Sequence, residues 1–182
     1  TDGDEVKGAI FETKQGRRAI LATVVVDATG DLDVCAQAGG AYVTDCVERN
    51  DCPFTGNVDQ SMAAIGTLLD RIDVTPLQGS DGRMLTSSTM LTAIITPLYS
   101  QSNWGYLDQL FETAAEGDAD VALSLADFYY DRSNGEYLSN STEAFAAINC
   151  LDYPNADDVE QMRAEAAELA EIAPTIGRFQ GF

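Results

Sequence analysis

The sequence contains no histidine. Without an imidazole, neither a Ser-His-Asp triad, a Cys-His dyad nor a His-ligated metal site can be completed from these residues alone. The sequence also lacks an apolar run of the roughly 18 residues that a membrane span needs, and it opens without a basic and apolar signal peptide. We therefore expect no metal site, no membrane span and no His-dependent catalysis within this chain.

Basic side chains are scarce. Lysine and arginine together number 10 against 30 acidic residues, which gives a formal net charge of −20 over 182 residues. Such a charge repels a phosphate backbone, so we expect no nucleic-acid partner. An apolar share of 45% is typical of a folded globular protein. The acidity also fits a solvated surface or a non-catalytic acidic interaction module.

Several catalytic and cofactor motifs are missing. The nucleophile elbow G-x-S-x-G is absent, because Gly79-Ser80-Asp81-Gly82 has the wrong spacing. The phosphate-binding patterns G-x-G-x-x-G and G-x-x-x-x-G-K-[ST] are absent as well. The acidic pair at residues 157–158 stands at a predicted helix start, where aspartate side chains cap free backbone amides. We therefore interpret the pair as a helix cap rather than as two catalytic acids. The sequence therefore predicts no catalytic residue and no resident cofactor.

The four cysteines contain no C-x-x-C pair, which argues against a zinc or thioredoxin-like site. Only Cys46 and Cys52 lie close enough in sequence to form a local pair. We expect them to form a disulfide in an oxidising compartment, worth roughly 2 to 3 kcal/mol of stability. The pairing of Cys35 and Cys150 stays open.

The hydrophobic pattern predicts a mainly α protein with a short N-terminal β-rich segment. Residues 6–27 favour a hairpin turning at Lys14-Gln15-Gly16, with Val24-Val25-Val26 typical of a buried strand. A short turn or helix is expected at residues 34–38, and Gly39-Gly40 is expected to end it. A helix capped by Asp59 is then predicted at residues 60–72, and a second one starts at Ser87 or Ser88 and ends or kinks at Pro97. Further helices are predicted from 104 to near 117, from Asp118 or Asp120 to 129, at 142–150 and at 157–173.

Aromatic residues gather in the second half of the chain. Such a set more often forms core, but it could instead line a substrate groove. Under the groove interpretation the candidates are Tyr99, Trp104, Phe128 and Tyr129.

Two stretches resemble known families. Residues 18–31, Arg-Ala-Ile-Leu-Ala-Thr-Val-Val-Val-Asp-Ala-Thr-Gly-Asp, resemble an internal piece of FAD-dependent oxidoreductases with a Rossmann-type domain, and the similarity covers residues 6–42. In that family a strand ending in Ala-Thr-Gly leads to the flavin. The resemblance implies Gly30, Asp31 and Asp33 as cofactor-binding residues if FAD binds. Leu32 stands where the family commonly has glycine.

Residues 46–182 resemble the cap of tripeptidyl-aminopeptidase-like α/β-hydrolases. Members are exported serine peptidases or esterases whose helical cap covers the substrate cleft. The resemblance implies an extracellular or cell-envelope location and, as partners, a hydrolase core and a peptide or ester substrate. The resemblance to this cap rests on five short motifs in their order along the chain. They are Cys46 to Cys52-Pro53, Asp81-Gly82-Arg83-Met84-Leu85-Thr86, Leu98-Tyr99-Ser100 with Trp104, Ala126-Asp127-Phe128-Tyr129 before Arg132, and Ala147-Ile148-Asn149-Cys150 with Asp152.

The sequence thus predicts two segments, a β-rich one at residues 1–45 and a helical cap at residues 46–182. The expected function is substrate gating for a serine hydrolase, without a complete catalytic site. The alternatives are a fragment of an FAD-dependent oxidoreductase and a non-catalytic interaction module.

Overall fold

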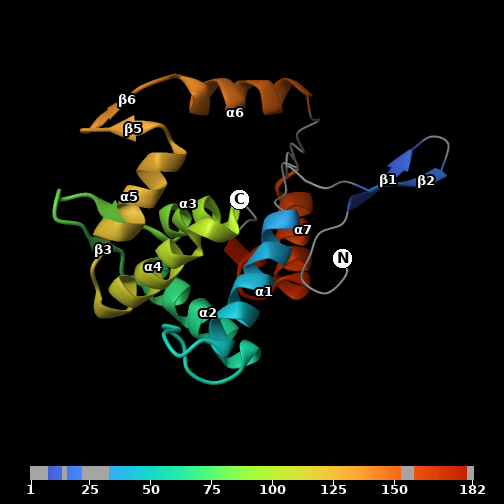
Figure 1. The fold of residues 1–182 in the computed structure, drawn as a ribbon. Coiled ribbons are helices and arrows are strands. Elements are labelled where there is room, and N and C mark those ends of the chain that lie inside the picture. The colour runs from blue at the N-terminus through green and yellow to red at the C-terminus, as the bar shows by residue number, and fades with distance from the viewer. Residues whose placement is uncertain (1–7, 14–15, 22–32, 153–157, 180–182) are drawn as a thin grey trace. The chain divides into compact units, whose positions relative to one another are not determined.

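The computed structural model describes residues 8–13, 16–21, 33–152 and 158–179, and these residues are mainly helical, as predicted (Figure 1). The chain divides into two compact units, Thr1–Ala41 and Tyr42–Phe182. The α-helices are α1 (Asp33–Glu48), α2 (Val58–Val74), α3 (Ser87–Leu98), α4 (Trp104–Glu116), α5 (Asp120–Tyr129), α6 (Ser141–Asp152) and α7 (Val159–Ile172). The strands are β1 (Gly8–Thr13), β2 (Gly16–Leu21), β3 (Leu77–Gln78), β4 (Met84–Leu85), β5 (Arg132–Ser133) and β6 (Glu136–Tyr137), and two short 3-10 helices are η1 (Gln101–Asn103) and η2 (Gly177–Phe179).

Strands β1 and β2 of the N-terminal unit form an antiparallel hairpin. Gly8 pairs with Leu21 and Thr13 pairs with Gly16, which confirms the predicted hairpin. The predicted strand through Val24-Val25-Val26 and the predicted cofactor residues Gly30 and Asp31 lie outside the described residues. Asp33, the third predicted cofactor residue, is the first residue of α1.

Helix α1 runs through Gly39 and Gly40, so the predicted break at this pair is wrong. A glycine inside a helix costs about 1 kcal/mol relative to alanine. The following turns of the helix bury Tyr42, Val43 and Cys46 almost completely. Each buried side chain of this size contributes about 1.5 to 3 kcal/mol, so packing outweighs the weak propensity of the glycines.

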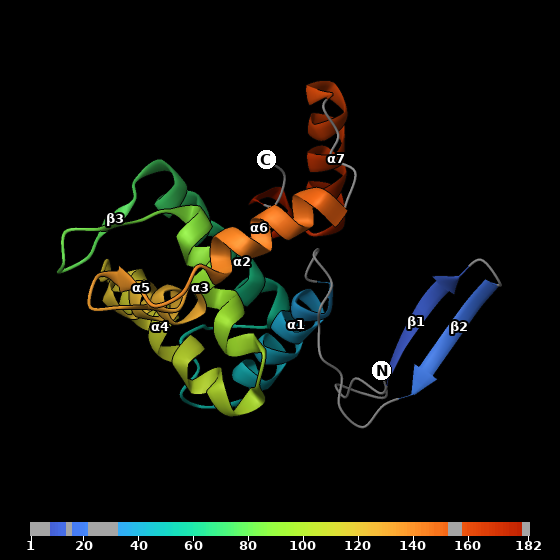
Figure 2. The same ribbon diagram turned by 90° about the horizontal axis from the view of Figure 1, so that it is seen from above.

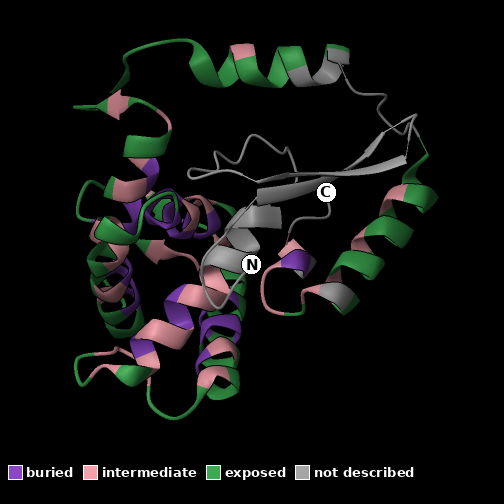
Figure 3. Cartoon of the chain, turned by 45° about the vertical axis from the view of Figure 1, so that its right-hand side comes forward, coloured by how far each residue is buried: buried purple, intermediate pink, exposed green. Residues whose placement is uncertain are grey.

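The core of the second unit lies among α2, α3, α4 and α5, with α3 packed most extensively on α5. Figure 3 shows buried residues concentrated in these helices, whereas the described parts of α6 and α7 are largely exposed. The buried residues follow the predicted apolar stripes, at positions three and four apart. They include Ile65, Leu69, Ile72, Met90, Leu91, Ile94, Leu107, Leu110, Phe111 and Leu123.

One helix start differs from prediction and another agrees with it. Asn57 rather than Asp59 caps α2, because the Asn57 side chain accepts the Gln60 amide at 3.0 Å while Gln60 Oε1 accepts the Asn57 amide at 2.9 Å. This reciprocal capping box satisfies two otherwise free amide groups. Helix α3 starts at Ser87, one of the two predicted positions, and its cap is Thr86.

The ends of α3 and α4 follow the expected breakers. Pro97 lies in the last turn of α3, which ends at Leu98. Gly117 adopts a left-handed φ of 95° after α4, a conformation that side chains disfavour. The Asp118 carboxylate accepts the Asp120 amide at 2.8 Å where α5 begins, so Asp118 is the acid that supports this helix start. Among the described residues, no helix has the length and apolar character to cross a membrane.

Cys46 and Cys52 form a disulfide with their Cα atoms 5.1 Å apart, which confirms the predicted pairing. Closing so short a loop lowers the entropy of the unfolded chain, and we expect reduction to lower the free energy of unfolding by about 2 kcal/mol. Urea unfolding of the wild type with and without reductant measures this change, and a C46A/C52A variant separates it from other effects of the reductant. Equal midpoints in all three samples would contradict the expectation.

Candidate functional site

A cavity of about 310 Å³ lies beside the C-terminal half of α5, near the lower limit of small-molecule pockets of about 300 to 1,000 Å³. Helix α5 supplies one wall, and the segment around β4 and the β5–β6 hairpin supply others. We call it the Arg83–Arg132 cavity. Its lining consists of Arg83, Met84, Thr89, Leu123, Ala126, Asp127, Tyr130, Arg132, Gly135 and Tyr137.

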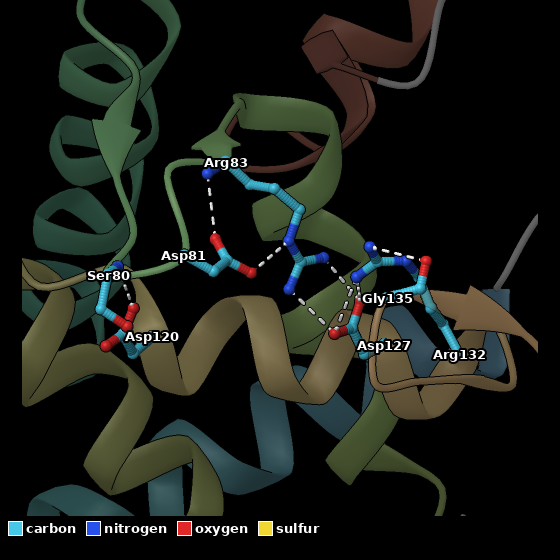
Figure 4. Close-up of polar contacts among 7 residues, drawn as sticks. All are labelled: Ser80, Asp81, Arg83, Asp120, Asp127, Arg132 and Gly135. Carbon is cyan, nitrogen blue, oxygen red and sulfur yellow. Dashed lines mark hydrogen bonds and ion pairs between the residues drawn. The ribbon is translucent and has the colours of Figure 1, made fainter.

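The Asp127 carboxylate is bound by two arginines at once, and Figure 4 shows it between their guanidinium groups. Arg83 binds it in a bidentate manner, with Nη1 to Oδ1 at 2.7 Å and Nη2 to Oδ2 at 2.9 Å. Arg132 Nη1 approaches the same two oxygens at 3.2 and 3.3 Å. Bidentate, charge-assisted hydrogen bonds are among the strongest polar contacts in proteins, so Asp127 fixes both arginines in place.

Arg83 is held from its other side by Asp81, whose carboxylate accepts both the Arg83 amide at 2.9 Å and Nε at 2.6 Å. These bonds, the backbone one first, hold the pKa of Asp81 below its usual value. The side-chain bonds to Asp127 and then to Asp81 raise the pKa of Arg83. Arg83 therefore stays positively charged and is attached both to its own loop and to α5.

The same loop is attached to the start of α5. Asp120 Oδ1 accepts the Ser80 amide at 2.7 Å, and this bond is the main cause that lowers the pKa of Asp120 (Figure 4). The loop at residues 79–83 is thus fixed to both ends of α5, through Asp120 and Asp127. This double attachment gives the cavity wall a defined position.

The β5–β6 hairpin places Arg132 over the cavity. Its turn uses left-handed backbone at Asn134 and Gly135, and Asp131, which precedes β5, is left-handed as well. Asparagine, aspartate and glycine tolerate this conformation best. Arg132 Nη2 donates to the Gly135 carbonyl at 3.3 Å, and its guanidinium carbon lies 6.0 Å from the centre of the Tyr137 ring. The turn therefore orients the Arg132 side chain as well as reversing the chain.

The side chains that line the cavity include two arginines and one aspartate, whereas the chain as a whole is acidic. Residues 46–182 carry six basic residues, all arginine, and two of them line this cavity against one carboxylate. Apolar side chains and tyrosine rings form the remaining walls, and the Tyr130 hydroxyl lies 3.1 Å from Thr92 Oγ1. Such a lining can bind and orient a small ligand.

The described residues show no group of three or more metal-ligating side chains. A second cavity, of about 420 Å³, lies beside α2. Among the described residues that line it, the charged side chains are the carboxylates of Asp59 and Asp70. None of these described lining residues is cationic, so this cavity is the weaker candidate for binding an anion.

None of the four aromatic residues predicted for a groove lines either cavity. Trp104 begins α4 and meets Tyr42 edge-on at 5.8 Å, with its Nε1 buried and no acceptor among the described residues. Tyr99 follows α3 and is half exposed. Phe128 and Tyr129 end α5 and are exposed, Tyr129 meeting Tyr130 edge-on. A groove formed by these four residues stays a prediction.

A second polar cluster, the Asp108 cluster, joins α1 to α4. Asp108 accepts two hydrogen bonds from Arg49, each 2.9 Å long, and one from the Tyr42 hydroxyl at 2.9 Å. Burial, followed by the hydrogen bond to Asp108, raises the pKa of Tyr42. Arg49 also contacts Asp45 and Asp51. The cluster stands beside the Cys46–Cys52 disulfide and stabilises the same end of α1.

A family model described as FAD dependent oxidoreductase matches residues 1–178, and by this match the chain belongs to that family. The match extends beyond residues 6–42, where the sequence resemblance was placed, into the helical unit.

Two hydrolases from Mycobacterium tuberculosis are also similar to this chain. One is named serine protease Hip1, with 32% identity over 150 residues, and the other carboxylesterase B, with 32% identity over 143 residues. Each match covers 77% of this chain but only 29% and 28% of the respective relative. The chain thus spans less than a third of the length of these curated relatives, and their names support a hydrolase-related segment.

In Rossmann-type domains, a parallel β–α–β unit with a glycine-rich turn holds the pyrophosphate of a dinucleotide such as FAD. The strand pairs of the described residues are all antiparallel, and the sequence contains no G-x-G-x-x-G. The described residues alone therefore do not contain this dinucleotide-binding unit.

Proposed function

We propose that residues 46–182 form a substrate-gating cap of a serine peptidase or esterase, and that the chain by itself is catalytically incomplete. The observation that carries this proposal is the 32% identity to two hydrolases over 77% of the chain. The Arg83–Arg132 cavity supports it, because the cavity offers binding groups without a nucleophile and its base.

In the whole enzyme the reaction would be acyl transfer through a serine, with an oxyanion hole stabilising the tetrahedral intermediate. A cap contributes by excluding water and by selecting the substrate. The fixed loop at residues 79–83 and the β5–β6 hairpin suit that task, since two arginines anchor them on α5 through Asp127. The cap would shape the cleft, while the catalytic groups come from a hydrolase core.

We also propose an extracellular or cell-envelope location for the hydrolase. The Cys46–Cys52 disulfide supports it, because disulfides persist in oxidising compartments. The partners would be the hydrolase core and a peptide or ester substrate.

The purified chain is expected to be silent in three assays: hydrolysis of a chromogenic ester, hydrolysis of an aminoacyl-anilide, and labelling by a fluorophosphonate probe. The reason is that it supplies neither a nucleophile elbow nor a histidine. Carboxylesterase B, assayed alongside, is the positive control. Labelling together with turnover would overturn the proposal and require a nucleophile of another kind.

Gating itself is tested in a chimera in which residues 46–182 replace the matching segment of carboxylesterase B. Fluorophosphonate labelling reports that the core is intact. The proposal expects retained labelling with a changed preference among acyl groups. Retained labelling with an unchanged preference would contradict gating.

A second candidate function is a fragment of an FAD-dependent oxidoreductase, which the family match over residues 1–178 favours. The test is incubation with excess FAD followed by desalting. Flavin absorbance retained at one equivalent would support this candidate, and a colourless protein would count against it.

A further inference from the structure

We propose that the Arg83–Arg132 cavity binds the carboxylate of a small acid with an apolar or aromatic body, the kind of product that ester or peptide hydrolysis releases. The source of that acid rests on the proposed hydrolase function, whereas the binding itself rests on the contacts within the cavity. In this role the cavity recognises the acid side of the cleaved bond.

The first support is that Arg132, among the described residues, pairs with a single acid, which it shares with Arg83. Two guanidinium groups share the single carboxylate of Asp127. Arg83 has a second acid, Asp81, but that side chain is 48% exposed and water weakens its effect. Arg132 is 18% exposed and contacts no other acid among the described residues. A ligand carboxylate would give Arg132 a second anionic partner.

The second support is the supply of unused donors. A guanidinium carries one N–H on Nε and two on each terminal nitrogen, arranged as a planar fork. Arg132 uses Nη1 for Asp127 and Nη2 for the Gly135 carbonyl, which leaves Nε–H and the second hydrogen of each terminal nitrogen. A carboxylate matches such a fork better than a neutral amide does, because both of its oxygens accept charge-assisted bonds.

The third support is the apolar part of the lining. Leu123 and Ala126 form a buried wall on α5, and Met84 and the Tyr137 ring line the cavity with exposed surface. The 310 Å³ volume admits one small ring or aliphatic chain beside the carboxylate. The cavity therefore suits an acid with one apolar group rather than an inorganic anion or a long polyanion.

The long-range field of a chain with net charge −20 opposes any anion. Salt screens this repulsion over about 10 Å at roughly 0.1 M, whereas a contact inside a partly buried cavity is screened less. Binding is therefore to be measured in about 0.15 M salt.

Calorimetric titration of the 182-residue chain with phenylacetate and with N-acetylphenylalanine tests the proposal, each beside its neutral amide. Phenylacetate represents an acid released from an ester, and N-acetylphenylalanine represents a peptide C-terminus. We expect the acids to bind at least about tenfold more tightly than the amides, because only they accept two charge-assisted bonds. The acid that binds more tightly identifies the source.

The matched variants are R132Q and R163Q. R132Q is expected to weaken acid binding roughly tenfold and to leave amide binding unchanged. Arg163 forms an exposed pair with Glu160 and does not line the cavity, so R163Q removes the same charge outside the proposed site and should leave both affinities unchanged. R132K keeps the charge without the fork and should lie between wild type and R132Q.

Equal binding of acids and amides by the wild type, or no binding of either acid at millimolar concentration, would overturn the proposal without any variant. Equal effects of R132Q and R163Q would overturn it too. The outcome is separable from that of the proposed function. If the chain binds acids selectively but the chimera keeps the acyl preference of carboxylesterase B, the binding site is supported and the gating function is refuted. If the chimera changes its preference but the chain shows no acid-selective binding, the gating function is supported and the binding site is refuted.

Discussion

Replacement of Asp127 by alanine is expected to lower the free energy of unfolding by about 3 kcal/mol, at the low end for breaking a partly buried ion pair. The variant leaves two guanidinium groups facing each other without the shared carboxylate. It also releases the loop at residues 79–83 and the β5–β6 hairpin from the same point on α5. The effect should therefore exceed the loss of one hydrogen bond.

Urea unfolding followed by circular dichroism measures this difference. The control is Glu160→Ala, which removes an equal charge from an exposed pair with Arg163 and should change stability by less than about 0.5 kcal/mol. A loss below about 1 kcal/mol for Asp127→Ala would show that the two arginines find other partners or water at little cost.

Replacement of Asp108 by alanine should have an effect of similar size, again about 3 kcal/mol. Asp108 accepts bonds from Arg49 and from the hydroxyl of Tyr42, a residue that is 2% exposed. Without the carboxylate, the Tyr42 hydroxyl loses its acceptor inside the core. An unsatisfied buried group and a lost bidentate pair thus add to each other.

Asp51→Ala is the matched control, because Asp51 pairs with the same Arg49 but is 79% exposed. Its effect should be below about 0.5 kcal/mol. Tyr42→Phe should lower the free energy of unfolding by about 1 kcal/mol in the wild type. In the Asp108→Ala background the same substitution should lower it much less, because its hydrogen-bond partner is already absent. Additive losses would contradict that coupling.

The helices were predictable from sequence because their apolar residues recur at three- and four-residue spacings. The stripe Ile65, Leu69, Ile72 defines the buried face of α2 without any knowledge of its partners. The caps were less predictable, since Asn57, Asp59 and Thr86 all offer suitable oxygens and the neighbouring turn decides between them. The passage of α1 through Gly39-Gly40 depends on tertiary packing of Tyr42 and Val43, which local propensity does not contain.

The contacts of the candidate site were not predictable in the same way. Arg83 and Asp127 are separated by 44 positions, and no periodicity states that they meet. Both residues belong to motifs that resemble the hydrolase cap, but these motifs do not indicate that the two side chains meet. One signal was present: arginine alone supplies the cations of residues 46–182, and arginine is favoured where planar pairing with carboxylates is needed.

The use of arginine in the Asp108 cluster and around Asp127 has a consequence for chemical labelling. Both lysines of the chain, Lys7 and Lys14, lie within residues 1–45, so residues 46–182 present no side-chain amine. Acylating reagents and amine cross-linkers would modify lysines only in the β-rich segment and leave the arginine pairs of the helical segment intact. A dye or surface tether can thus be placed on one segment while the cavity on the other stays chemically unaltered.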